Sequence, residues 1–194
     1  MIPQQHAGRT VLAFFWADNS LNSNLRNNIR TMMQGLQAMK DSAALLVYWD
    51  GEASDISWPE PCIVEYVTNG QGRINSMSKE AVNAMIADQD MSVHDLISIG
   101  NIRKKYSPQT STEKTVMQTV IGDMMSVYPS ESYGIIFGSH GSGWLPTITG
   151  TRSIGQDGGR YSSDTALIPE LAEVLRTVNP QKFDFVLFDA VSYT

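Results

Sequence analysis

One histidine of the chain lies in a setting suited to acid–base chemistry. The segment GSHGSGWLP, residues 138–146, follows an apolar run and presents His140 among glycines and serines, with Trp144 close behind. Because an imidazole takes up and releases a proton near neutral pH, a histidine in such a turn is a candidate general base. We interpret His140 as functional rather than as an ordinary loop histidine. His6 and His94 lie in the N-terminal segment and in a polar stretch, and are weaker candidates.

Composition restricts the partners that this histidine could serve. The chain has 194 residues, a net charge of −6 and 42% hydrophobic residues, which suits one domain with a sizeable core. The acidic balance argues against nucleic acid or an anionic membrane, since both attract a basic face. No apolar run reaches the roughly 18 residues of a membrane span, and no signal peptide is apparent. The single cysteine, Cys62, excludes an internal disulfide and is interpreted as a small core residue rather than a nucleophile.

Apolar runs alternate with amphipathic segments along the chain. Continuous apolar runs predict buried strands over residues 10–18, 43–51, 133–141 and 183–190, with a weaker strand over 62–67. Helical patterns predict helices over residues 20–40, 78–88, 111–127 and 165–178. Residues 90–109 are ambiguous, and residues 141–160 indicate a glycine-rich loop. The alternation predicts an α/β fold with a mostly parallel sheet and helices on both faces.

Polar residues follow three of the predicted strands, at Asp18-Asn19, Ser139-His140 and Asp189. In open α/β sheets, ligands bind at the carboxyl ends of the strands, near a change in strand order. We interpret Asp18-Asn19 chiefly as an N-cap of the next helix. Asp189 is either a hydrogen-bonded strand-end carboxylate or part of a binding pocket. Local spacing also predicts a capping box, formed by Thr110 and Glu113, for the helix over 111–127.

Three segments resemble the signature segments of the clostripain family of cysteine peptidases: TVLAFFWADNSL, GIIFGSHGSGW and FDFVLFDA. The resemblance runs from residue 9 to the end of the chain. It implies a caspase-like, three-layer α/β/α sandwich and cleavage of peptides after Arg or Lys. It also implies that His140 polarises a cysteine nucleophile and that Asp189 helps to form the acidic pocket for the basic side chain. Gly141 and Trp144, next to the histidine, would contribute to substrate binding.

The nucleophile of the family is missing from this pattern. Where the family has Asp-Ala-Cys, this chain has Asp-Ala-Val, ending at Val191. Valine offers no nucleophilic atom, so thiolate chemistry cannot proceed there. Ser192 follows one residue later, but successive residues of a strand point to opposite faces. Ser192 would therefore point away from His140 unless the strand has already ended.

We consider three functions on this basis. The first is a pseudo-peptidase that keeps a peptide-binding crevice while its chemistry is impaired or lost. The second is an Arg/Lys-specific cysteine endopeptidase, seen here in an altered or truncated form. The third is a structural or interaction module without catalysis. We favour the first, because the histidine and the aspartate match the family pattern and the nucleophile does not.

The resemblance has further implications outside these residues. It implies one clostripain-like domain over residues 1–194 that continues beyond Thr194, with processing at Arg152 or Arg160 in the glycine-rich stretch. It also implies a bacterial protein in the periplasm or outside the cell, a peptide or protein partner with a basic residue and, in some relatives, calcium. The residues themselves indicate no metal or cofactor site, and they leave the oligomeric state open.

Overall fold

The protein is described by a computed structural model that covers residues 7–51, 60–141, 153–157, 164–181 and 183–192. An eight-stranded sheet forms its centre. The strands are β1 (Ala7–Ala17), β2 (Ala43–Gly51), β3 (Cys62–Thr68), β4 (Asn101–Lys105), β5 (Ser130–Gly141), β6 (Ser153–Asp157), β7 (Asp164–Leu167) and β8 (Phe185–Ser192). The helices are α1 (Asn22–Ala38), α2 (Lys79–Ala87), α3 (Val93–Ile99), α4 (Lys114–Val127) and α5 (Ile168–Val178).

The centre of the sheet is parallel, as the continuous apolar runs predicted. Strand β1 pairs in parallel with β2 on one side and with β5 on the other, and β8 pairs in parallel with β5. Strands β3 and β4 extend the sheet beyond β2 in antiparallel fashion, and β6 and β7 form an antiparallel extension near the end of β5. The four predicted buried strands are therefore neighbours in one mostly parallel sheet, which confirms the predicted fold class.

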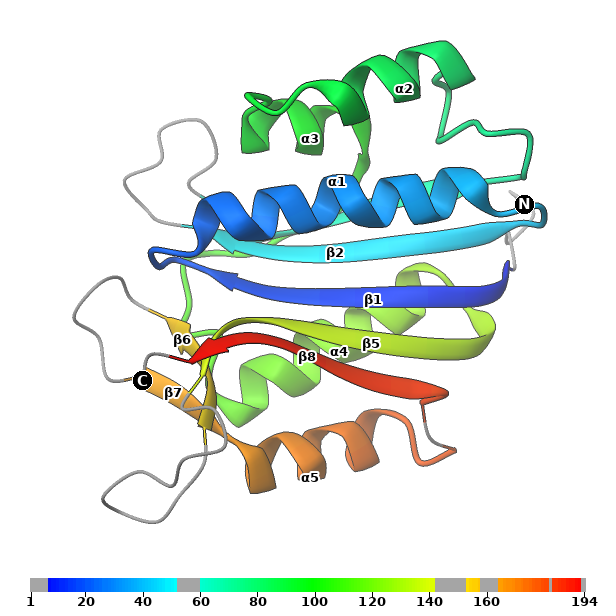
Figure 1. The fold of residues 1–194 in the computed structure, drawn as a ribbon. Helices are drawn as coiled ribbons and strands as arrows, with labels where there is room; N and C mark the ends of the chain where they lie inside the picture. The colour runs from blue at the N-terminus through cyan, green and yellow to red at the C-terminus, as the bar shows by residue number, and fades with distance from the viewer. Residues whose placement is uncertain (1–6, 52–59, 142–152, 158–163, 182, 193–194) are drawn as a thin grey trace.

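Helices cover both faces of the sheet (Figure 1), with α1, α2 and α3 on one face and α4 and α5 on the other. Each face carries its own apolar core, which we name the α1-side core and the α4-side core. Consecutive residues of β1 face opposite cores: Phe15 lies in the α1-side core and Phe14 in the α4-side core. This double burial explains why the central strands are apolar throughout rather than alternating. Within the described ranges, no helix is long and apolar enough to cross a membrane.

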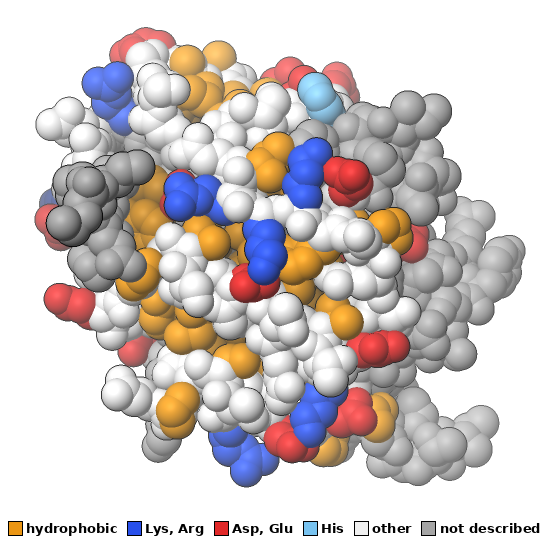
Figure 2. Space-filling view, turned by 180° about the vertical axis from the view of Figure 1, so that it is seen from behind, with side chains coloured by type: hydrophobic (Ala, Val, Ile, Leu, Met, Phe, Trp, Pro, Cys, Tyr) orange, Lys and Arg blue, Asp and Glu red, His pale blue; other side chains and the backbone are white. Residues whose placement is uncertain are grey.

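The face of the molecule opposite to the one seen in Figure 1 carries charges of both signs. Basic and acidic side chains are interspersed there among apolar ones (Figure 2). Two ion pairs tie α4 to its neighbours: Lys104 of β4 pairs with Asp123, and Lys114 pairs with Glu173 of α5. These contacts join α4 to the sheet edge at β4 and to the neighbouring helix α5.

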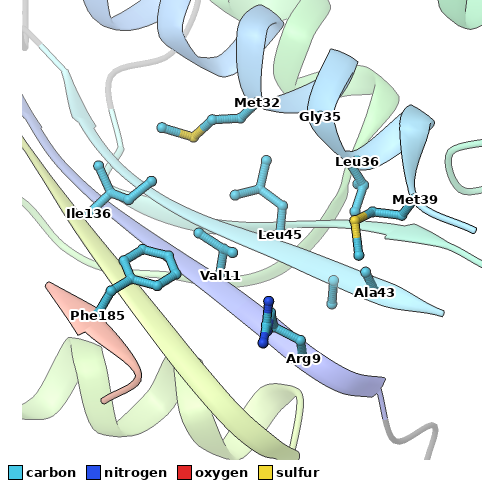
Figure 3. A pocket seen from close by; sticks show the side chains of 11 residues that line it. Arg9, Val11, Met32, Gly35, Leu36, Met39, Ala43, Leu45, Ile136 and Phe185 are labelled. Carbon is cyan, nitrogen blue, oxygen red and sulfur yellow. The ribbon is translucent and has the colours of Figure 1, made fainter. Parts of the chain in front are cut away.

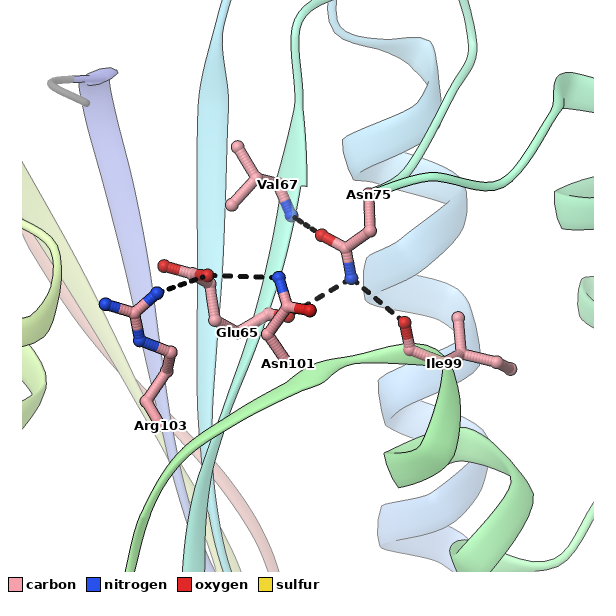
Figure 4. A network of polar contacts seen from close by, with 6 residues as sticks. All are labelled: Glu65, Val67, Asn75, Ile99, Asn101 and Arg103. Atoms are coloured by element: carbon pink, nitrogen blue, oxygen red, sulfur yellow. Dashed lines mark hydrogen bonds and ion pairs between the residues drawn. The ribbon is translucent and has the colours of Figure 1, made fainter. Parts of the chain in front are cut away.

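A polar network connects β3 and β4 with the segments next to them (Figure 4). The carboxylate of Glu65, 4% exposed, accepts hydrogen bonds from the Asn101 amide at 3.3 Å and the Arg103 guanidinium at 3.2 Å. The Asn75 side chain accepts a bond from the Val67 N–H at 2.9 Å and donates to the Ile99 carbonyl at 3.0 Å. A buried carboxylate needs such partners, and here they join β3, β4 and the end of α3.

Several local predictions are corrected by the structure. The ambiguous residues 90–109 contain α3 and β4, and the predicted glycine-rich loop over 141–160 contains β6. The last helix begins at Ile168 rather than at 165, because β7 takes the preceding residues and a proline occupies the first turn.

Both predicted caps are also wrong. The N-cap of α1 is Leu21 and has no side-chain cap, because Asn19 lies two residues too early and its side chain accepts a hydrogen bond from the Leu21 N–H at 2.9 Å. The helix α4 begins after Glu113 with no side-chain cap, since Thr110 and Glu113 form a backbone turn ahead of it.

Candidate active site

His140 is positioned by the end of β5. Alternate residues of this strand face the α1-side core, where Ile136 packs against it. Gly138 follows on the same face, and a Cβ atom at this position would come within 2.7 Å of Leu25 and Phe15. A side chain here would force Leu25 or Phe15 to shift, so glycine allows α1 to lie this close to β5. His140 continues the alternation on the α1 face, with its side chain 7% exposed.

The turn between β1 and α1 contacts this histidine. The Ser20 hydroxyl oxygen lies 2.9 Å from His140 Nε2. The preceding Asn19 amide donates to the Trp16 carbonyl at 2.7 Å and to the Ser139 hydroxyl at 3.3 Å, so the turn is tied to the end of β5. Ser20 is not among the residues that the sequence predicted for the site. The available signal was its place after β1, since the ends of neighbouring parallel strands meet at one edge of a sheet.

Strand β8 brings Val191, the position that the sequence pattern predicts for the nucleophile, to the same edge. The parallel register pairs His140 with Val191 and Gly138 with Asp189. Paired positions of neighbouring strands share a face of the sheet, so the backbone sets position 191 beside the histidine. Ser192 is paired with Gly141, one step further along both strands.

Asp189 lies one pleat before position 191, about 6.6 Å along the strand at the usual rise per residue. Its side chain is exposed, and its carboxylate accepts a hydrogen bond from the Asn28 amide of α1. Asp189 therefore faces α1, on the face of the sheet that His140 also occupies. An exposed carboxylate at this place can attract a cationic side chain.

A cavity of about 330 Å³ lies on the same face, between the second half of α1 and the strands β1, β2, β5 and β8 (Figure 3). Met32, Leu45, Ile136 and Phe185 line it, with Arg9 at the sheet's opposite end from His140. Apart from Arg9, its lining is apolar, and it lies toward the amino ends of β1 and β2. The cavity is thus a gap in the packing between α1 and β8, separate from the residues that could do chemistry.

The other predicted site residues are placed as follows. Gly141 ends β5 and pairs with Ile154 of β6. Trp144, Arg152 and Arg160 lie outside the described residues. Cys62 is fully buried in the α1-side core, as the sequence indicated. In the part of the chain that the structure describes, no cluster of three metal-ligating side chains occurs.

Comparisons with known proteins give a consistent result. The sequence model of the clostripain family, peptidase C11, matches residues 13–192. A secreted C11 cysteine protease from Bacteroides thetaiotaomicron, solved with an irreversible peptide inhibitor, is 30% identical with a TM-score of 0.62, and the match covers 95% of this chain and 42% of that one. An inactive zymogen C11 protease from Parabacteroides distasonis is 26% identical with a TM-score of 0.62, over 98% of this chain and 43% of that one. A B. fragilis cysteine protease is 26% identical with a TM-score of 0.50, over 73% of this chain and 95% of that one.

A search of curated proteins found no match. The chain spans less than half the length of the first two relatives, 42% and 43%. Because the family's sequence model extends over nearly all of the chain, from residue 13 to residue 192, the chain belongs to the clostripain family of cysteine peptidases.

Proposed function

We propose that this chain is a peptide-binding peptidase domain whose own chemistry is impaired. The observation that supports the proposal most directly is the register of β5 and β8, which pairs His140 with Val191. A general base beside a position without a nucleophile can bind and orient a peptide, but it cannot form an acyl-enzyme with a thiol. The chain would then lack the family's cysteine chemistry because residue 191 has no sulfur atom.

The proposed ligand is a peptide or protein segment with an Arg or Lys side chain. Asp189 supplies the exposed carboxylate, and a relative of this chain was solved with a peptide inhibitor bound. A positive side chain gains attraction and orientation from a carboxylate at the base of its site. Because that relative is described as secreted, we further propose that this protein acts outside the cytoplasm.

We also propose that the chain does not process itself. Arg152 and Arg160 are the basic residues at which such processing would occur. Without a thiolate, the chain should cut neither the peptide bond after Arg152 nor the one after Arg160. A purified sample kept at neutral pH should stay intact by mass spectrometry, and cleavage after either arginine that disappears in His140→Ala would contradict an impaired site.

The decisive experiment restores the sulfur. Val191→Cys should yield a thiol beside His140, and the two side chains are close enough in volume that the sheet should accept the change. We expect cleavage of short reporter peptides after Arg or Lys and little cleavage after Leu. Val191→Ala is the matched control without a thiol, and Val191→Cys combined with His140→Ala is the control without the base.

The result that would contradict the proposal is equally specific. A folded Val191→Cys protein that neither cleaves these peptides nor reacts at residue 191 with a thiol-directed peptide inhibitor would favour an interaction module. Cleavage by the unaltered chain that is lost in His140→Ala would instead favour an active endopeptidase with another nucleophile.

A further inference from the structure

The contact between Ser20 and His140 joins two parts of the chain that are 120 residues apart. Ser20 is exposed, whereas the imidazole that it contacts is buried. A hydroxyl oxygen 2.9 Å from a ring nitrogen is within hydrogen-bond distance. One nitrogen of His140 is therefore engaged by the turn that connects β1 with α1.

The turn itself is held in place by its own hydrogen bonds. Asn19 contacts the Trp16 carbonyl and the Ser139 hydroxyl through its amide nitrogen, and its oxygen accepts the Leu21 N–H. Ser139 is fully buried and directly precedes His140. The same residue pair of β5 thus receives both contacts from the turn, which fixes Ser20 relative to the imidazole.

We propose that Ser20 is a positioning residue for His140. Its hydroxyl oxygen accepts the hydrogen of Nε2, which fixes the orientation of the ring and keeps the proton on that nitrogen. In a neutral imidazole with hydrogen on Nε2, the basic nitrogen is Nδ1. With the hydroxyl in this accepting role, Ser20 holds the tautomer in which Nδ1 receives a proton. This inference rests on the proposed function, since it assigns the part that Ser20 plays in the same site.

The first test uses the chain as it stands. The sequence has three histidines, so ¹⁵N-labelled histidine gives few signals, and His140→Ala identifies the one of interest. We expect the nitrogen shifts of His140 to report hydrogen on Nε2, and Ser20→Ala to shift the ring toward a mixture of tautomers. Ser20→Thr, which keeps a hydroxyl, should restore the parent signals. Hydrogen on Nδ1 in the parent chain would overturn the inference.

The second test measures the consequence for chemistry in the Val191→Cys background. The rate of alkylation of residue 191 by iodoacetamide, followed by mass spectrometry against pH, gives the pKa of the new thiol. Pairing with an oriented imidazole should hold this pKa below the free value of about 8.5. Ser20→Ala should move the profile toward that value and lower the rate of peptide cleavage about tenfold through kcat, with KM little changed.

Ser23→Ala is the matched control. Ser23 lies in the first turn of α1, and its hydroxyl contacts the Asn24 side chain at 3.3 Å instead of the histidine. This variant should leave the thiol profile and the cleavage rate unchanged. Ser20→Thr should again resemble the parent.

The outcomes separate the two proposals. If His140→Ala alters the thiol profile and Ser20→Ala does not, the inference fails and the proposed function stands. If His140→Ala leaves the pH profile of the thiol at residue 191 unchanged, the proposed function fails. The tautomer measurement on the unaltered chain still tests whether Ser20 orients His140. Labelling of Ser20 itself by a fluorophosphonate in the unaltered chain would also overturn the inference, because Ser20 would then donate its proton to the ring as a nucleophile.

Discussion

In the proposed function, Val191 lacks the sulfur that the peptidase chemistry needs, while His140 and Asp189 lie on the same face of the sheet. His140 is buried at the end of β5 with Ser20 at its Nε2, and Asp189 meets Asn28 of α1. These contacts come from two different parts of α1 and the turn before it. At the scale of residues, His140 and Asp189 are therefore both contacted from the α1 side of the sheet, His140 by the turn before the helix and Asp189 by the helix itself.

Asp189 should contribute to the binding of basic peptides. Asp189→Asn removes the charge and keeps the shape, so we expect the affinity for a peptide ending in Arg to fall about fivefold, the size of a charge pair of about 1 kcal/mol. Binding of the matching Leu peptide should not change. Isothermal titration calorimetry measures both. Asp184→Asn is the control, since Asp184 is an exposed carboxylate just before β8 that pairs with Arg9 instead.

Gly138 should be required for the approach of α1 to β5. The Cβ atom of Gly138→Ala would come within 2.7 Å of Phe15 and Leu25, so we expect a loss of about 1–3 kcal/mol in the free energy of unfolding. Gly122 is the matched position, because a Cβ there has nothing within 4 Å. Gly122→Ala should stabilise α4 by about 0.5–1 kcal/mol. Urea unfolding measures both changes, and the same change in the free energy of unfolding for the two variants would contradict this prediction.

At the scale of elements, α3 has the strongest local start signal of the helices. The Ser92 hydroxyl accepts the Asp95 N–H at 3.1 Å, and the Asp95 carboxylate accepts the Ser92 N–H at 3.3 Å, which completes a capping box. Hydrogen bonds from the Ser92 side chain and backbone lower the pKa of Asp95 below its ordinary value. This helix carries Val93, Leu96 and Ile97 into the α1-side core.

Ser92→Ala should weaken this start and raise the pKa of Asp95 toward its ordinary value. A carboxyl group with a lowered pKa in the folded state contributes stability above its unfolded pKa, and this stability is lost as pH falls through the folded pKa. The thermal stability of the variant should therefore fall less than that of the parent between pH 6 and pH 3. Ser98→Ala is the control, because Ser98 contacts only the Asp95 carbonyl and not its carboxylate. An unchanged Asp95 titration in Ser92→Ala, followed by NMR, would count against the capping box.

At the scale of the whole molecule, β4 and β8 each pair with a single neighbouring strand, and they differ in chemistry. Strand β4 carries three consecutive basic residues, Arg103, Lys104 and Lys105. Strand β8 instead exposes Phe185, Val186, Leu187 and Phe188, which are 39–51% accessible. Charged residues protect a strand from pairing with other chains, whereas an exposed apolar strand favours association.

The chain described here should therefore associate with itself through β8 at raised concentration. Leu187 is 51% exposed, and Leu187→Lys should lower the mass that sedimentation velocity reports in a concentration series. The control is Ile102→Lys on β4, where the side chain is 39% exposed. A parent chain that stays monomeric across the series, or a control that dissociates the assembly equally well, would exclude β8 as the contact.

The sequence by itself determined the central sheet and the place of the histidine. The central strands β1, β2, β5 and β8 appear in the sequence as continuous apolar runs. Such runs are typical of parallel strands in the centre of a sheet, so the local composition is enough to predict them. The resemblance to the family pointed to His140, Asp189 and Val191 because each of them lies within a short, continuous sequence motif. Residues 90–109 resisted prediction, since α3 and β4 are short and β4 is polar.

Only the tertiary structure decided which side chains meet in the site. Asn19 looked like a helix cap, yet its amide donates a hydrogen bond to the Ser139 hydroxyl at the end of the neighbouring strand β5. Ser20 meets His140 over a separation of 120 residues, and Asn28 meets Asp189 over 161. No periodicity or spacing within a segment encodes such pairs. They follow from the parallel register of β1, β5 and β8, which brings the ends of these strands to one edge, and from Gly138, which lets α1 lie close enough to reach them.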